Sequence, residues 1–182
     1  MLNKSVARRY AEAFFSLAQE QGKIDEFEKD LETVVKILNE TEYLKEYLGH
    51  LLIQPQAKKD VMTKLLAEKV SQNTLNFIHL IVDKRREKYI EIITEEYKNM
   101  ADESRNITKA ELVAAREVPE EYIKDLAEKL SKATGKTIKI TQKVEPALLG
   151  GVKIRIGDQV IDGTVAKKLE TLREKLRQAK IS

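Results

Sequence analysis

The chain has 182 residues, of which 42% are hydrophobic, 35% charged and 5% aromatic, and its net charge is +3. This composition is typical of exposed, ion-rich helices more than of an aromatic-lined ligand pocket. Because there is no cysteine, disulfides, thiolate catalysis and cysteine-ligated zinc are excluded. No apolar run approaches the roughly 20 residues of a membrane span. The amino-terminal segment lacks the apolar core of a signal peptide and Glu12 is atypical of a mitochondrial presequence, so we expect it to belong to the mature protein.

The two parts of the chain differ in charge. Residues 1–105 carry 17 basic and 19 acidic side chains, whereas residues 106–182 carry 16 basic and 11 acidic ones. A basic second part favours an acidic protein partner, an anionic membrane surface or nucleic acid. Its charges are scattered along the sequence, which weakens the nucleic-acid option.

Helical periodicity continues from the start of the chain to about Glu103 and predicts about six helices. The clearest, over residues 24–38, has one apolar stripe. Short connections between such helices favour a compact bundle. The predicted breaks fall at Gly22, near Thr41, at 49–55, near Ser71 and at 83–87.

After residue 105 the period changes to that of a mixed domain. Residues 110–115 are predicted to form a strand, Pro119 to open a helix that Gly135 ends, and residues 138–144 to form a second strand. We therefore expect an α+β, mostly helical fold, with a six-helix bundle over 1–105 and a small mixed α/β domain with a β-hairpin over 106–182.

The glycine-rich segment from Gly150 to Gly163 raises the question of a phosphate-binding loop. Its spacing matches neither a Walker loop nor a dinucleotide fingerprint. Alternation over 152–156, a Gly157-Asp158 turn and a return over 159–162 predict a hairpin instead, with Lys153 opposite Asp162.

A last helix is expected to follow the hairpin, with Thr164 as its cap. It carries an apolar seam at a spacing of four, three and four residues. We expect this seam to pack on the domain's own sheet; the alternative is a seam for a partner helix. The seam consists of Val165, Leu169, Leu172 and Leu176.

Two helices carry more apolar surface than a bundle requires. In the first helix, the residues from Val6 to Ala18 spread apolar side chains over an arc of about 200°. In the fifth, residues 75–82 mostly face inward, but Leu80 projects beside Asn76 and Asp83. Either the first helix is buried on most sides, or a groove between the two helices accepts a partner's amphipathic helix.

The sequence offers few groups for catalysis. His50 and His79 are the only histidines and lack ligand spacing, no serine lies in a nucleophile elbow, and most acidic residues occupy solvated helix faces. We expect no catalytic site, no metal site and no cofactor, and therefore not an enzyme.

Three segments resemble the delta subunit of bacterial F-type ATP synthase, a relative of the mitochondrial oligomycin sensitivity conferral protein. Residues 150–172 (GGVKIRIGDQVIDGTVAKKLETL) resemble the carboxy-terminal signature of that family. Residues 6–15 (VARRYAEAFF) are similar to its first helix and residues 76–87 (NFIHLIVDKRRE) to its fifth. One departure is Lys84-Arg85, where many members have Asn-Gly.

The resemblance implies a noncatalytic stator subunit that links the catalytic head to the peripheral stalk, so that the head resists rotor torque during proton-driven ATP synthesis. It implies two partners, the amino-terminal helix of the alpha subunit and the carboxy-terminal end of the b-subunit stalk. The chain would lie at the cytoplasmic face of the bacterial cell membrane and contact the membrane only through the complex. The residues expected against the alpha-subunit helix are Val6, Tyr10, Ala13, Leu17, Asn76 and Leu80.

The alternative is a nucleic-acid-binding protein that uses the basic second domain. It predicts an affinity that falls steeply with salt.

Overall fold

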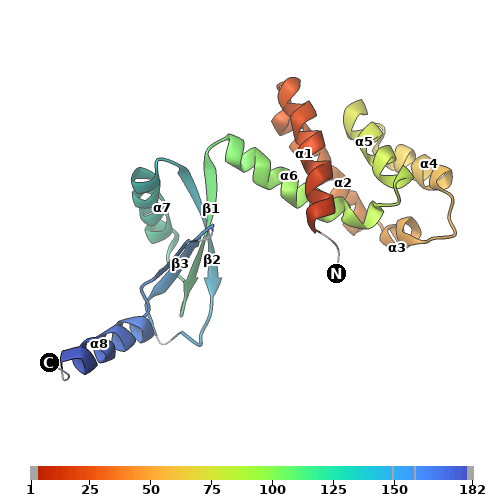
Figure 1. Cartoon of the computed structure of the whole chain (residues 1–182). Coiled ribbons are helices and arrows are strands. Elements are labelled where there is room, and N and C mark those ends of the chain that lie inside the picture. The colour runs from red at the N-terminus through yellow and green to blue at the C-terminus, as the bar shows by residue number, and fades with distance from the viewer. Residues whose placement is uncertain (1–3, 149, 158, 180–182) are drawn as a thin grey trace. The chain divides into compact units, whose positions relative to one another are not determined.

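The computed structural model describes residues 4–148, 150–157 and 159–179 (Figure 1). The chain divides into two compact units, Met1–Asp102 and Glu103–Ser182. Within the described residues the first unit is helical, and the second combines a four-stranded sheet with two helices. The α+β, mostly helical fold class is therefore confirmed. The boundary expected at residue 105 lies just beyond the helix Ile90–Ser104 (α6), and the division falls in the last turn of that helix.

The helices of the first unit begin and end near the breaks in the sequence pattern. Gly22 has a φ of 65° after the first helix, Pro55 opens the fourth, and the hydroxyl of Ser71 caps the fifth by accepting from the backbone N–H of Thr74. The elements are α1 (Lys4–Glu20), α2 (Ile24–Glu40), α3 (Leu44–Gly49), α4 (Pro55–Leu66), α5 (Gln72–Asp83), a 3₁₀ turn (Glu87–Tyr89) and α6 (Ile90–Ser104).

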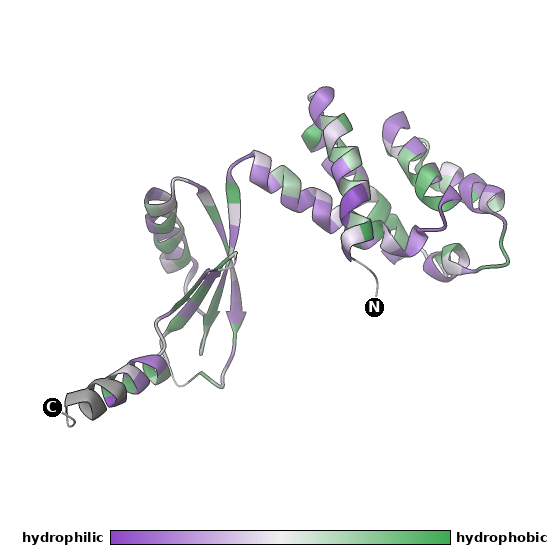
Figure 2. Cartoon of the chain, in the orientation of Figure 1, coloured by the Kyte–Doolittle hydropathy of each residue, from purple (hydrophilic) through white to green (hydrophobic). Residues whose placement is uncertain are grey.

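Stacked aromatic rings join three of these helices in the core. The ring of Phe14 on α1 lies 4.8 Å from that of Phe27 on α2 and 4.1 Å from that of Phe77 on α5, measured between centroids. The apolar residues of α5, green in Figure 2, are buried as the sequence predicts, with the exception of Leu80; the buried ones are Leu75, Phe77, Ile78, Ile81 and Val82. Aromatic pairs of this kind stabilise packing by about 0.5–1.5 kcal/mol each, so α1 and α5 are held in a fixed relation.

A buried carboxylate fixes the start of α5 against α2. One oxygen of Asp30 accepts hydrogen bonds from the backbone N–H of Ser71 at 2.8 Å, from its hydroxyl at 2.6 Å and from the hydroxyl of Thr74 at 2.7 Å. A second buried carboxylate, that of Glu87, pairs with Lys58 at 2.7 Å. Both carboxylates are exceptions to the expectation that most acidic residues occupy solvated faces, and each has polar partners that offset its burial.

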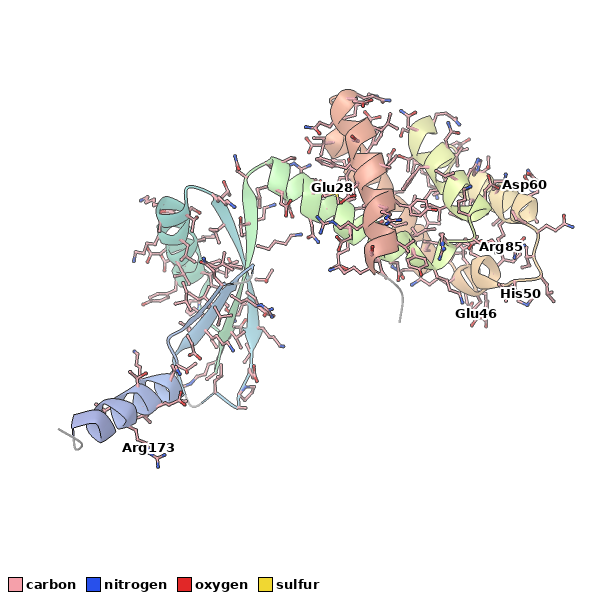
Figure 3. All side chains as sticks on the ribbon, in the orientation of Figure 1. Glu28, Glu46, His50, Asp60, Arg85 and Arg173 are labelled. Carbon is pink, nitrogen blue, oxygen red and sulfur yellow. The ribbon has the colours of Figure 1, made fainter. Side chains whose placement is uncertain are left out.

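The turn after α5 contains the Lys84-Arg85 departure from the family pattern. Arg85, which is labelled in Figure 3, has a φ of 54°, in the left-handed region that favours glycine. The backbone N–H of Arg86 donates to the carbonyl of Ile81 and that of Arg85 to the carbonyl of Val82, each at 2.9 Å. This is the Schellman arrangement that ends many helices, so the turn forms here with an arginine at its left-handed position.

The second unit is built on a sheet with the strand order β2-β1-β3-β4. β1 and β2 are parallel and α7 connects them, whereas the other pairs are antiparallel. β1 begins earlier than predicted because Ile107 to Lys109 pair with the start of β2. The elements are β1 (Ile107–Ala114), α7 (Glu120–Thr134), β2 (Thr137–Val144), β3 (Val152–Ile156), β4 (Gln159–Asp162) and α8 (Val165–Ala179).

The glycines of the hairpin region allow a turn and a close approach of backbone to backbone. A β-carbon on Gly151, whose φ is 83°, would lie 2.5 Å from the carbonyl oxygen of Gly163. The hairpin register is confirmed, since Lys153 pairs with Asp162 across β3 and β4. Gly157 has a φ of 56°, while its predicted turn partner Asp158 lies outside the described residues.

The packing expected for the last helix is wrong. The side chains of Val165, Leu169 and Leu172 on α8 are 42%, 57% and 53% exposed. Leu176 lies outside the described side chains. The sheet's core is instead completed by α7, through Ile123, Leu126 and Leu130, so the domain has no need of the seam for its own packing.

Candidate functional site

A groove of 760 Å³ runs between α1 and α5. It exists because α1 carries two adjacent apolar stripes. One stripe, formed by Ala7, Ala11, Phe14 and Ala18, is buried in the bundle. The other is displaced by one residue along the helix and forms one wall of the groove; it consists of Val6, Tyr10, Ala13 and Leu17.

The structure brings all six sequence-predicted residues together in this groove. Val6, Tyr10 and Leu17 are half-buried, Ala13 is exposed, and Asn76 and Leu80 are exposed on the opposite wall. Leu80 is 45% exposed, which is unusual among the otherwise buried apolar residues of α5. The groove therefore presents apolar side chains that the bundle itself does not cover.

The floor of the groove is closely packed. It includes Phe14 and Phe77, whose rings stack with an angle of 12° between their planes. At one end, the amide of Asn73 donates to the side-chain carbonyl of Gln21 at 2.9 Å and links α5 to the residue that follows α1. A preformed groove binds with less loss of conformational entropy than one that must assemble around its ligand.

The charged side chains in the groove lining are both cationic, those of Arg9 and Arg86. The guanidinium carbon of Arg86 lies 5.5 Å from the centre of the Tyr89 ring, a cation–π contact that orients it. A ligand that places negative charge beside these two residues is favoured over one that places positive charge there.

Sequence reasoning missed five lining residues: Arg9, Phe14, Asn73, Phe77 and Arg86. Asn73 was open to prediction, because it lies three and seven residues before Asn76 and Leu80 and therefore on the same helical stripe. Arg9 is charged, whereas the predicted set followed the apolar arc of its helix. Phe77 was expected to face inward, and together with Phe14 it also lines the groove.

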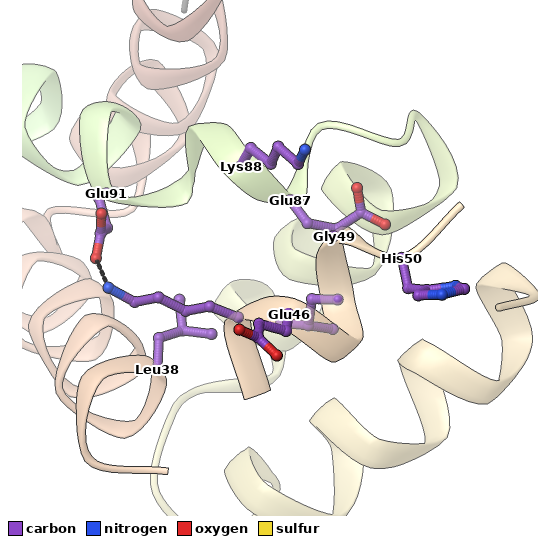
Figure 4. A pocket seen from close by; sticks show the side chains of 9 residues that line it. Leu38, Glu46, Gly49, His50, Glu87, Lys88 and Glu91 are labelled. Atoms are coloured by element: carbon purple, nitrogen blue, oxygen red, sulfur yellow. Dashed lines mark hydrogen bonds and ion pairs between the residues drawn. The ribbon is translucent and has the colours of Figure 1, made fainter. Parts of the chain in front are cut away.

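A second cavity, of 490 Å³, lies among the end of α2, α3 and the start of α6 (Figure 4). Two of its carboxylates are already engaged in ion pairs, Glu91 with Lys45 at 2.5 Å and Glu87 with Lys58. His50, also in the lining, accepts a hydrogen bond from the backbone N–H of Leu52 at 3.3 Å through Nδ1. These groups stabilise the bundle locally.

The two histidines lie in different surroundings. His79 shares a hydrogen bond of 2.9 Å with the hydroxyl of Thr63 and does not line the cavity that includes His50. Across the part of the chain that the structure describes, no three histidine, aspartate or glutamate side chains gather as a possible metal site. The groove between α1 and α5 is the strongest candidate for function.

Comparison with known proteins shows the family. The model of the family described as ATP synthase delta (OSCP) subunit matches residues 6–176. The chain belongs to this family. It is 62% identical over 182 residues to the ATP synthase subunit delta of Syntrophomonas wolfei, with both chains fully covered. It is 40% identical to that of Desulforamulus reducens, with 97% of each chain covered.

A solved structure supports the same fold. A chain in the mitochondrial ATP synthase hexamer of Toxoplasma gondii matches with a TM-score of 0.71 at 20% identity, and the match covers 93% of this chain and 96% of that one. The chain is thus a noncatalytic stator component of F-type ATP synthase and a peripheral subunit of that membrane-bound complex. No described helix is both long and apolar enough to span a bilayer. The nucleic-acid alternative is not supported.

Proposed function

We propose that the groove between α1 and α5 receives the amphipathic amino-terminal helix of the alpha subunit at the top of the catalytic head. The helix-in-groove mode needs a row of apolar contacts about the width of one helix. Val6, Tyr10, Ala13 and Leu17 provide such a row on one wall, and Leu80 faces it from α5. Because Ala13 is small and exposed, a helix can approach α1 closely at that point.

The second unit, in this proposal, holds the carboxy-terminal end of the b-subunit stalk. The chain then acts as a bridge at the cytoplasmic face of the bacterial membrane, bound through its partners and not inserted. A bridge under rotor torque needs contacts that dissociate slowly, and enclosed apolar contacts provide this without a cofactor. The head is thereby kept from turning during proton-driven ATP synthesis.

The single observation that carries the proposal is the second apolar stripe of α1, which the bundle covers only in part and which lines one groove together with Leu80. The test is an NMR titration of the whole chain with a peptide of the same organism's alpha-subunit amino-terminal helix. We expect saturable shifts at Tyr10, Leu17 and Leu80. Amides of the hairpin, such as that of Arg155, should not move and provide the control within the same spectrum.

Two results would contradict the proposal. The absence of shifts at any peptide concentration would mean that the groove does not bind this helix. Shifts centred on the cavity beside His50, with the α1 signals unchanged, would place the alpha-subunit contact elsewhere on the bundle.

A further inference from the structure

The groove between α1 and α5 has two chemically different ends. The amide of Asn73, near the start of α5, donates to the side chain of Gln21, just past the end of α1. Farther along both helices, the rings of Phe14 and Phe77 stack on each other. The contacts thus move toward the start of α1 as they move toward the end of α5, so the two helices run antiparallel along the groove.

Both arginines of the groove lining lie at the end where α1 begins and α5 stops. Arg9 lies more than one helical turn before Phe14, and Arg86 comes after the end of α5. On the other side of the stacked rings, the lining contains Leu17 and the uncharged amide of Asn73. We call the first the cationic end of the groove and the second its amide end.

The positive charges at the cationic end are not neutralised within the chain. Within residues 4–148, neither guanidinium takes part in an ion pair with a carboxylate. The nearest carboxylates along the sequence belong to Glu12 and Glu87, and they pair with other cations at 3.0 and 2.7 Å. Arg9 is exposed and Arg86 is half-buried. The groove therefore offers two uncompensated positive charges at one end and none at the other.

The apolar contacts of the groove do not by themselves fix the direction of a bound helix. The apolar row on α1 extends from Val6 at the cationic end to Leu17 at the amide end. An amphipathic helix carries its apolar stripe along its whole length, so it can cover this row in either direction. Charges at one end of the groove remove this ambiguity, because they attract carboxylates and repel cations.

We propose that Arg9 and Arg86 set the direction of the bound helix by pairing with carboxylates near one end of its apolar stripe. The inference rests on the proposed function, because the occupant is the amino-terminal helix of the alpha subunit. The more acidic end of that helix lies at the cationic end of the groove, and its other end lies beside Asn73. The rest of the alpha subunit then leaves the groove from one end only, which gives the head a single attachment geometry.

The direction is measured by NMR on the full chain with a nitroxide-labelled peptide of the same organism's alpha-subunit amino-terminal helix. One sample carries the nitroxide at the more acidic end of the peptide and a second carries it at the other end. A nitroxide broadens the signals of nearby amides. We expect the first sample to lose the amide signals of Val6 and Lys84, and the second to lose those of Gln21 and Asn73.

The role of the arginines is tested with the double variant Arg9→Gln, Arg86→Gln. The matched control is Lys84→Gln, Lys88→Gln, since both lysines are exposed, flank Arg86 in the sequence and lie outside the groove lining. Calorimetry with the unlabelled peptide should show binding weakened about fivefold in the arginine variant and less than about twofold in the control. Both nitroxide samples should broaden both ends of the groove in the arginine variant, and thermal unfolding checks that each variant is folded.

A second peptide separates pairing with carboxylates from a general effect of charge. It carries asparagine and glutamine in place of its aspartates and glutamates. We expect the wild-type chain and the Arg9→Gln, Arg86→Gln variant to bind this peptide with the same affinity, because the arginines have lost their partners. A persistent fivefold difference would show that the arginines act without carboxylates and would overturn the inference.

The remaining outcomes distinguish the inference from the proposed function. If the native peptide does not bind the wild-type chain, both fail. If it binds in the groove with the opposite direction, or keeps its direction in the arginine variant, the groove assignment stands and the inference is wrong. An equal loss of affinity in the lysine control would show that only overall charge matters and would also overturn the inference.

Discussion

Replacing Leu80 by asparagine should abolish most of the binding in the groove while leaving the bundle folded. Leu80 is 45% exposed, and complete burial of a leucine contributes about 1.5–3 kcal/mol, so covering its exposed part contributes about 1 kcal/mol. An amide enclosed there without a partner costs a further 1–3 kcal/mol or so. The expected loss is about 3 kcal/mol, which is about a hundredfold in Kd. Asparagine is chosen because a new charge would interact with Arg9 and Arg86, which also line the groove.

The assay is calorimetric titration of the whole chain with the alpha-subunit peptide, alongside thermal unfolding. The matched control is Leu52→Asn, since Leu52 is 87% exposed and lies outside the groove. Both substitutions change surface positions, so the free energy of unfolding should shift by less than about 0.5 kcal/mol in each. Binding by the Leu80→Asn variant within about twofold of wild type would refute the reasoning.

Three further predictions concern stability. Asp30→Ala leaves the donors at the start of α5 unpaired and should lower the free energy of unfolding by about 3 kcal/mol, measured by urea denaturation. Gly151→Ala should destabilise the second unit by more than about 2 kcal/mol, because its β-carbon would collide with the backbone at Gly163; signals of the first unit in the same NMR spectrum should persist. Hydrogen bonds from the hydroxyl and then the backbone N–H of Thr164 hold the pKa of Asp162 below its usual value, with smaller help from nearby lysines. Since the folded pKa is the lower one, this stabilisation is present above the ordinary aspartate pKa of about 3.9 and is lost as the pH falls through the folded pKa. An NMR titration of the Asp162 carboxylate in the wild-type chain checks the lowered pKa directly, and Asp162→Asn should remove the corresponding part of the loss of stability at acid pH.

Much of the architecture could be predicted because local signals and tertiary packing agree. The glycine at 22, the proline at 55 and the glycine at 135 mark helix ends in both the sequence and the structure. The hairpin register followed from the alternation over β3 and a two-residue turn, which place Ile161 opposite Ile154 and Asp162 opposite Lys153. The groove residues followed from the width of the apolar arc on α1 together with the family resemblance.

The remaining features depend on contacts between distant segments, which periodicity does not contain. An apolar stripe predicts that another segment packs on it but does not identify that segment. For α8 the expected packing on the sheet was wrong, because α7 already completes the core of the sheet. The contact of Asp30 with Ser71 spans 41 positions and has no local signal. The charged residues of β3 are different: Lys153 and Arg155 are two residues apart and lie on one side of the strand, as alternation alone could have shown.

The central claim is that this chain joins head to stalk through two separate surfaces. Sedimentation velocity of the isolated catalytic head, the full chain and the soluble b-subunit segment tests it most directly. We predict one complex that contains all three components, and no association of head with stalk segment when the chain is left out. Association of head and segment without the chain, or displacement of one partner by the other, would contradict the claim.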